Sequence, residues 1–360
     1  MVKAVADSLI KVFVPLLILK SSGSMTLVIL YLCLYNPLCV LLNLIFKQCL
    51  QKYGVISIII HFVPLIAVQF LLNLKITWLI CVLLAIFMAF AQVLYSVPIN
   101  ILFSLTDKSI DVAKFEIPTN IGKMVFLLIS GYMLSASFKN SLLVLSIAGS
   151  VLYFISAIPI YYGYNLLKIS FTDRVSIQSK IPENYKFYNL FHAQFGLFQT
   201  IFDVALPLYL FLNNLTFQSI TIILVLIEIC KIGSNILAKF LISKNLSLLS
   251  AFISIFIMTL SFTILLFVKN SIVLYVCSCL LAVSFPLIFV PMLSSYTKKL
   301  CDEDNQFDGM TIRDVFIFIP RGAVYLPYLI FPSFILQFGI GIACAVSMTY
   351  STTKILKTNK

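Results

Sequence analysis

The chain alternates between long apolar segments and short polar breaks, from one end to the other. A helix needs about 20 predominantly apolar residues to cross the hydrocarbon core of a bilayer. Runs such as Ile76–Phe90 and Ser141–Ile160 are continuously apolar and lack the in–out alternation of a membrane strand. The pattern therefore predicts twelve membrane helices, over residues 4–20, 25–46, 54–73, 76–101, 117–136, 140–164, 189–212, 217–240, 246–268, 271–295, 312–335 and 337–353.

Composition supports a membrane protein. Hydrophobic residues make up 61% of the chain and charged residues 11%, whereas charged residues are about a quarter of an ordinary soluble domain. The net charge of +12 is carried by residues that punctuate the apolar segments. We therefore expect the chain to meet the lipid bilayer and no nucleic acid.

The basic residues also predict the orientation. When the N-terminus is placed inside, nineteen Lys and Arg residues fall on the inner side and four on the outer side, as the positive-inside rule requires. The three longer loops, 102–116, 165–188 and 296–311, then all lie inside. We predict a multi-pass protein of a bacterial cytoplasmic (inner) membrane with both termini in the cytoplasm.

The two halves of the chain resemble each other. Residues 8–52 align with residues 200–244 without a gap, at an offset of 192, and a shorter match has an offset of 198. The aligned pairs include Pro15 with Pro207, Asn43 with Asn235, Lys52 with Lys244, and Asn120–Lys123 with Phe318–Arg321. Repeats in an apolar chain are typical of transporters whose halves rock around a central site.

These features together predict an all-α integral membrane protein with about twelve transmembrane helices in two pseudo-symmetric six-helix bundles. The first bundle covers residues 1–164 and the second covers residues 189–360. A cytoplasmic linker, residues 165–188, joins them and is the longest polar stretch of the chain. Pro320, together with two further prolines, predicts a kink in the eleventh helix.

The loop between helices two and three carries a weak family signature. Residues 47–56 read Lys-Gln-Cys-Leu-Gln-Lys-Tyr-Gly-Val-Ile. With the helix count and the repeat, the stretch resembles the Gly-x-x-x-Asp-Arg-x-Gly-Arg-Arg loop of the major facilitator superfamily. Lys52 and Gly54 match it, whereas Gln51 replaces the acid; residues 312–321 also resemble the start of helix eleven in divergent members. The resemblance implies a secondary transporter with helices one and seven lining a central cavity.

Five ionisable residues fall at mid-membrane depth: Asp7, Lys11, Asp203, Glu228 and Lys231. Such residues cost about 2.5–3.5 kcal/mol on insertion scales and are candidates for function. Asp7 and Lys11 are four residues apart, and Glu228 and Lys231 are three apart, so each pair can form along one helix face. These pairs are gating candidates, with the alternative that they only offset their own insertion cost.

Asp203 has no partner within its own helix. The repeat register sets it opposite Lys11, so it could bridge to Lys11, meet a cationic substrate or hold a proton. A carboxyl group removed from water retains its proton more readily. Asp203 is therefore our candidate for proton coupling.

Polar residues at helical spacing extend the candidate substrate site. His192, Gln199 and Asp203 form one stripe of helix seven, and Gln92, Tyr95, Ser96 and Asn100 share a face of helix four. The alternative is that each forms a helix–helix contact. Lys52 and Arg321 are further gating candidates, whereas His61 is expected to be a packed histidine that donates to a carbonyl.

No enzyme motif, metal-binding cluster or nucleotide-binding loop occurs in the sequence. We therefore expect no catalytic residues, no metal and no cofactor, and partners limited to a small-molecule substrate and protons; the sequence leaves the oligomeric state open. Two other functions remain open: a transporter fold that senses a ligand or holds partners without transport, and a flippase for lipids or lipid-linked saccharides.

Overall fold

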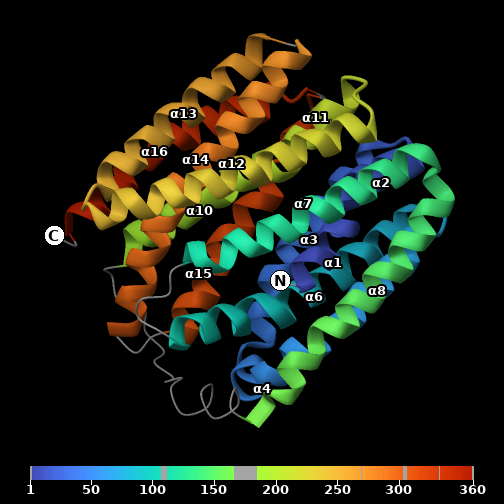
Figure 1. Cartoon of the computed structure of the whole chain (residues 1–360), viewed down its shortest axis with the longest axis horizontal. Helices are drawn as coiled ribbons and strands as arrows, with labels where there is room; N and C mark the ends of the chain where they lie inside the picture. Colours follow the sequence, from blue (N-terminus) through green and yellow to red (C-terminus); the bar gives the residue numbers. More distant parts are fainter. Residues whose placement is uncertain are drawn as a thin grey trace. The chain divides into compact units, whose positions relative to one another are not determined.

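The computed structural model of the chain describes residues 2–106, 112–165, 185–268, 270–302, 306–331 and 333–358, and the regular structure of these residues is helical (Figure 1). The first part of the chain forms α1 (Val2–Leu9), η1 (Lys11–Phe13), α2 (Val14–Ser22), α3 (Met25–Ile45), α4 (Lys47–Ile60), α5 (Phe62–Leu72), α6 (Trp78–Thr106), α7 (Val112–Ala136) and α8 (Phe138–Tyr162). The second part forms α10 (Lys186–Thr200), η3 (Ile201–Ala205), α11 (Leu206–Leu212), α12 (Phe217–Ser243), α13 (Ser247–Phe267), α14 (Ser271–Asp302), α15 (Gln306–Ala323), η4 (Leu326–Leu329) and α16 (Ile335–Thr358).

Among the described residues, eight helices are long and apolar enough to cross a membrane, or nine when α4 and α5, which meet at 47°, are taken as one bent span. Each predicted segment coincides with a helix or with a helix broken by a short interruption. The eleventh is interrupted as expected: α15 ends at Ala323, three residues after Pro320, and a 3₁₀ turn follows. The protein is therefore an all-helical, multi-pass membrane protein, and the twelve crossings stay a prediction.

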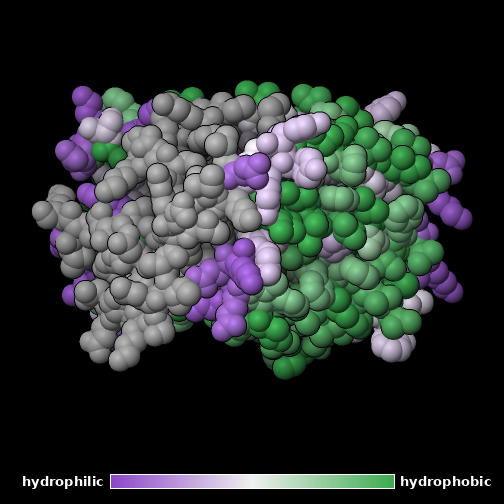
Figure 2. Space-filling view, turned by 90° about the horizontal axis from the view of Figure 1, so that it is seen from below, coloured by the Kyte–Doolittle hydropathy of each residue, from purple (hydrophilic) through white to green (hydrophobic). Residues whose placement is uncertain are grey.

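The surface agrees with a position in a bilayer. Large hydrophobic side chains are exposed on several helices, among them Trp78 on α6, Phe154 on α8 and Phe256 on α13. Figure 2 shows a broad hydrophobic area in the right half of the face, with hydrophilic side chains at its right-hand edge and others beside the grey atoms. A water-soluble protein rarely exposes an apolar area of this kind.

Two predicted loops are wrong in their length. α6 continues to Thr106 and α7 begins at Val112, while α14 continues to Asp302 and α15 begins at Gln306. The loops 102–116 and 296–311 are therefore largely helical, because a helix can extend past its apolar part into water. Likewise, α4 begins at Lys47 instead of residue 54, with a kink at Tyr53. Most of the predicted linker, residues 166–184, lies outside the described residues.

The first helix of each repeat is broken at the same place. α1 gives way to the 3₁₀ helix η1, Lys11–Phe13, and α10 gives way to the π-helix η3, Ile201–Ala205. After each interruption a new helix starts with a proline in its first turn, Pro15 in α2 and Pro207 in α11. Proline fits there because the first turn of a helix needs no N–H donor. The offset of 192 predicted from sequence thus relates the two interruptions, which we call the paired breaks.

Contacts between helices divide the chain into two compact units. Unit 1 contains Met1–Ile110, Ser137–Glu183 and Thr297–Ala323, and unit 2 contains Asp111–Ala136, Asn184–Tyr296 and Val324–Lys360. In unit 2, α7 lies along α12 (Figure 1), and in unit 1, α15 packs on α3 and α6. Each unit thus includes one helix from the other half of the sequence, and these two helices are related by the second repeat. The predicted division into residues 1–164 and 189–360 follows the sequence repeat. That these two parts move as separate domains stays a prediction.

The packing of α7 on α12 depends on a glycine. A Cβ atom added at Gly131 would lie 1.8 Å from Thr221 Oγ1, and this hydroxyl donates to the carbonyl of Phe217 at 2.7 Å. Small residues allow such close approach between membrane helices.

Gly131→Ala is therefore expected to destabilise the protein by about 1–3 kcal/mol, because overpacking forces the helices apart. Thermal melting of the purified protein in detergent measures the effect. Gly233→Ala on α12 is the matched control, since a Cβ there meets nothing within 4 Å. Equal melting temperatures for the two variants would contradict the close contact.

Candidate functional site

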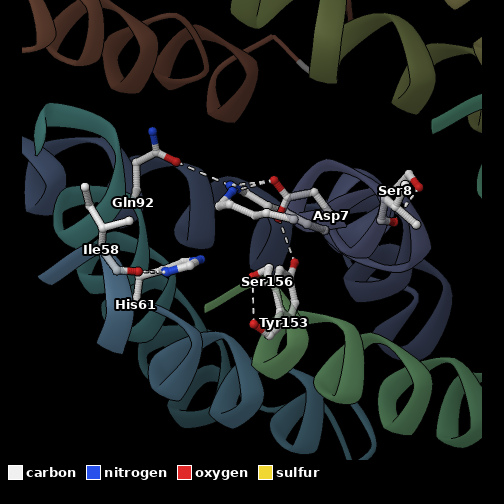
Figure 3. A network of polar contacts seen from close by, with 10 residues as sticks. Asp7, Ser8, Ile58, His61, Gln92, Tyr153 and Ser156 are labelled. Carbon is white, nitrogen blue, oxygen red and sulfur yellow. Dashed lines mark hydrogen bonds and ion pairs between the residues drawn. The ribbon is translucent and has the colours of Figure 1, made fainter. Parts of the chain in front are cut away.

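A network of polar side chains surrounds Asp7 inside unit 1 (Figure 3). We call it the Asp7 network; its members are Lys3, Asp7, Lys11, His61, Gln92, Tyr95 and Tyr153. Lys3, Asp7 and Lys11 follow one another at intervals of four residues, which brings them together on consecutive turns. The other members come from α6, α8 and the junction of α4 with α5.

Both oxygens of the Asp7 carboxylate are occupied. Lys3 Nζ lies 2.7 Å from Oδ2, and Lys11 Nζ lies 3.9 Å from the same oxygen. The hydroxyl of Tyr153 on α8 donates to Oδ1 at 2.7 Å. The ion pair expected between Asp7 and Lys11 is thus present, but Lys3 is the closer partner of the carboxylate.

Lys11 stands at the break in the first helix. Its Nζ donates to Gln92 Oε1 on α6 at 3.3 Å, and its side chain is 24% exposed. An ammonium group carries three donors, so these contacts leave donor capacity unused among the described residues. The structure thus joins two predicted site residues, Lys11 and Gln92, that lie on different helices.

His61 occupies the bend between α4 and α5. Its Nδ1 lies 2.5 Å from the carbonyl oxygen of Ile58, which agrees with the expected packed histidine that donates to a carbonyl. Its ring lies 4.7 Å from the ring of Tyr95, and Lys3 Nζ lies 4.2 Å from the centre of the same Tyr95 ring. Tyr95 therefore links the histidine to the charged part of the network, through a cation–π contact with Lys3.

A second buried ion pair lies in unit 1. Arg313 donates to Asp314 Oδ1 from Nε at 3.2 Å and from Nη2 at 2.8 Å. Ser96 on α6 donates to Asp314 Oδ2 at 3.1 Å. The predicted polar face of α6 therefore serves two purposes: Gln92 and Tyr95 face the Asp7 network, and Ser96 binds α15.

In unit 2 the expected ion pair of Glu228 and Lys231 is present on α12, with Nζ and Oε1 separated by 3.3 Å. Lys231 Nζ also lies 5.4 Å from the ring centres of both Phe202 in η3 and Phe285 in α14. Two aromatic faces and one carboxylate thus hold this ammonium group in an apolar setting. Its position beside η3 places a charge pair at the second of the paired breaks.

Asp203 lies within η3 and is exposed, with no hydrogen bond or ion pair to the described residues. His192 and Gln199 of the predicted stripe lie in α10, whereas a π-helical turn changes the register before Asp203, so a substrate site formed by all three stays a prediction. His192 is buried, and its ring packs 4.8 Å from that of Tyr296 on α14. Gln199 is half-buried. Of these three residues, only Asp203 has an exposed side chain.

The remaining candidates have simpler surroundings. Lys52 is exposed on α4, with its Nζ 5.2 Å from the Tyr53 ring. Arg321 on α15 lies 5.1 Å from the ring of Phe318. The side chain of Asn100 lies outside the described residues. Lys11 belongs to unit 1 and Asp203 to unit 2, and their contact stays a prediction.

Sequence reasoning missed three participants: Lys3, Tyr153 and the Arg313–Asp314 pair as a buried contact. Lys3 could have been found, since it precedes Asp7 by the same four residues that separate Asp7 from Lys11. Tyr153 gives no signal, because a tyrosine in an apolar run is ordinary. Among the described residues no group of three or more His, Cys, Asp and Glu side chains could hold a metal ion.

Known proteins resemble this chain in structure and not in sequence. No protein-family model matches the sequence, and no curated protein matches it. Among solved structures, a bacterial homologue of the iron transporter ferroportin in its outward-facing state aligns with a TM-score of 0.73 and 13% identity, over 98% of this chain and 96% of that chain. The inward-facing state of a bacterial ferroportin homologue aligns with a TM-score of 0.66 and 13% identity, over 99% and 96% of the two chains.

A third similar structure is the transporter FucP of the major facilitator superfamily, in its outward conformation. It aligns with a TM-score of 0.65 and 12% identity, over 98% of this chain and 96% of that chain. Another structure of FucP, from E. coli, is described as a fucose:proton symporter. Identities this low establish the fold and leave the cargo open. The chain therefore has the fold of the major facilitator superfamily along almost its whole length.

Proposed function

We propose that the protein is a secondary transporter that moves a small solute across a membrane by alternating access. The observation that carries the proposal is the pair of breaks, η1 and η3, at equivalent positions of the two repeats. Interrupted helices at corresponding positions of two halves are the best structural pointer to a transporter binding site. The fold shared with transporters supports the same function.

The breaks also carry charge. Lys11 begins η1 and Asp203 lies in the middle of η3. A charged residue within an apolar helix is expensive and tends to face a water-filled path or a partner. Each repeat thus carries one ionisable residue at its break, a cation in the first repeat and a carboxylate in the second.

Proton coupling through Asp203 is the more specific part of the proposal. Its side chain is exposed within the π-helical turn and makes no hydrogen bond or ion pair to the described residues. A carboxyl group in such a place can take up a proton on one side of the membrane and release it on the other. We further propose that both termini face the cytoplasm, as the distribution of Lys and Arg requires.

Asp203→Asn is expected to decrease the rate of proton-coupled uptake at least about tenfold. Asp203→Glu should retain part of the rate, because glutamate keeps a titratable group. The measurement uses proteoliposomes with an entrapped pH-sensitive dye, to which sugars, amino acids and organic acids are added in turn. Lys139→Gln is the control, since Lys139 is an exposed charge on α8.

Unchanged proton movement in Asp203→Asn would assign the coupling to another residue and leave the transporter intact. Absence of both proton movement and solute counterflow for every class of solute would contradict transport itself and favour a ligand-sensing protein with the same fold.

A further inference from the structure

We propose that the transported solute carries an acid group, a carboxylate or a phosphate, which binds at Lys11; this inference rests on the proposed transport function. It concerns the chemical class of the substrate, which neither the fold nor the similar structures define. The observations come from unit 1 alone, where all the contacts of the Asp7 network lie.

The charges of the Asp7 network do not balance. Two ammonium groups, Lys3 and Lys11, share the single carboxylate of Asp7, and Lys3 is the nearer by more than 1 Å (2.7 Å against 3.9 Å). Lys3 is further held over the face of Tyr95. Lys11 is therefore the surplus cation, and its one short contact is to the neutral amide oxygen of Gln92. An anion at Lys11 would relieve an uncompensated charge that is costly in an apolar surrounding.

The carboxylate is already engaged by groups of the protein. Asp7 Oδ2 is shared by the two lysines, and Oδ1 accepts the hydroxyl of Tyr153 at 2.7 Å. A cationic solute that approached this carboxylate would also meet two ammonium groups, which repel it. The network thus presents an ammonium group to a ligand and keeps its carboxylate engaged, which favours an anion over a cation.

His61 supplies a second, independent observation. It is 1% exposed, and its Nε2 is buried without a hydrogen-bond partner among the described residues. The ring lies within electrostatic range of Lys3, Asp7 and Lys11, and Figure 3 shows it beside Ile58, on the same side of the view as Gln92. Because Nδ1 donates to Ile58, the neutral ring offers Nε2 as an acceptor. A buried acceptor without a donor is unfavourable, and a ligand hydroxyl would satisfy it.

The two observations specify a small organic acid that also bears a hydroxyl group: the acid group accepts from Lys11 Nζ, and the hydroxyl donates to His61 Nε2. A bond between charged groups of this kind is worth roughly 1.5–3 kcal/mol. Its loss therefore corresponds to a decrease in affinity of about tenfold or more.

Matched pairs of solutes that differ in the acid group test the proposal. Thermal stability of the purified full-length protein is measured with gluconate against glucose, lactate against 1,2-propanediol, and glycerol 3-phosphate against glycerol. We expect at least one acid to raise the melting temperature where its neutral counterpart does not. The apparent affinity for the acid should fall about tenfold in Lys11→Gln. The stabilisation should persist in Lys11→Arg and in Lys139→Gln, which changes an exposed charge on α8.

The proposal is overturned if no acid stabilises the protein, if each neutral counterpart stabilises it equally, or if Lys11→Gln binds the acid as tightly as the unmodified chain. Counterflow of the same solutes in proteoliposomes separates this result from the proposed function. Transport of a neutral or cationic solute that acids do not inhibit would support the transporter and contradict the proposed acid substrate. Binding of an acid at Lys11 without counterflow would keep the site and reject transport.

Discussion

Asp7→Asn is expected to destabilise the protein by about 3–5 kcal/mol, the usual range when one partner of a buried ion pair is removed. Asp7 is the only carboxylate that contacts Lys3 and Lys11 among the described residues. Without it, two ammonium groups remain in an apolar surrounding and repel each other. Unfolding of the purified protein in mixed detergent, followed by circular dichroism, measures the loss.

Two comparisons isolate the charge from the hydrogen bonds. Tyr153→Phe removes the donor to Asp7 Oδ1 but leaves the charges unchanged, so its effect is expected to be smaller, roughly 1.5–3 kcal/mol. The double variant Asp7→Asn with Lys3→Met removes one charge of each sign and should recover most of the lost stability. If Asp7→Asn unfolds like the unmodified chain, water or another group must balance the lysines.

The elements of the fold could be predicted where one segment of sequence decides them. Apolar length located the helices, and the proline pair Pro15 and Pro207 revealed the repeat that relates the paired breaks. Ion pairs within one helix were equally accessible, because spacing alone brings Glu228 next to Lys231. In each case the information is local in the chain.

What could not be predicted depends on tertiary packing. Nothing in the sequence around Tyr153 indicates that its hydroxyl meets Asp7, since α8 must first pack against α1. The π-helical turn at η3 arises within an ordinary apolar stretch, and it changed which residues share a face with Asp203. Likewise, the association of α7 with α12 and of α15 with α3 crosses the predicted domain boundary.

The contacts of the two units suggest a common principle. In each unit a lysine near a paired break pairs with a carboxylate three or four residues away. An aromatic ring lies beside one lysine of each group, Tyr95 beside Lys3 and Phe202 beside Lys231. The units differ in the lysines near each carboxylate. Among the described residues, Glu228 has one lysine within 4 Å, Lys231, and interacts with Lys123 only at a longer distance, whereas Asp7 has two lysines within 4 Å. This difference is why the substrate anion is assigned to the first repeat.

Asp314→Asn should produce a loss of similar size, about 3–5 kcal/mol, for a different reason. Asp314 and Arg313 are both more than nine-tenths buried, and Asp314 Oδ1 accepts two hydrogen bonds from the guanidinium. The amide would leave the arginine charge buried without compensation and would weaken the bond from Ser96 on α6. Thermal melting in detergent again provides the measurement.

The double variant Arg313→Leu with Asp314→Leu decides between two roles for this pair. Replacing a buried ion pair with apolar residues is often neutral or stabilising, by about 1–4 kcal/mol. If the double variant melts at or above the temperature of the unmodified chain but loses solute counterflow, the pair serves the movement of α15 against α6. If the double variant instead melts at as low a temperature as Asp314→Asn, the pair and Ser96 hold α15 and α6 together. The double variant leaves no unpaired charge, so its lower melting temperature would come from the lost hydrogen bonds between the two helices.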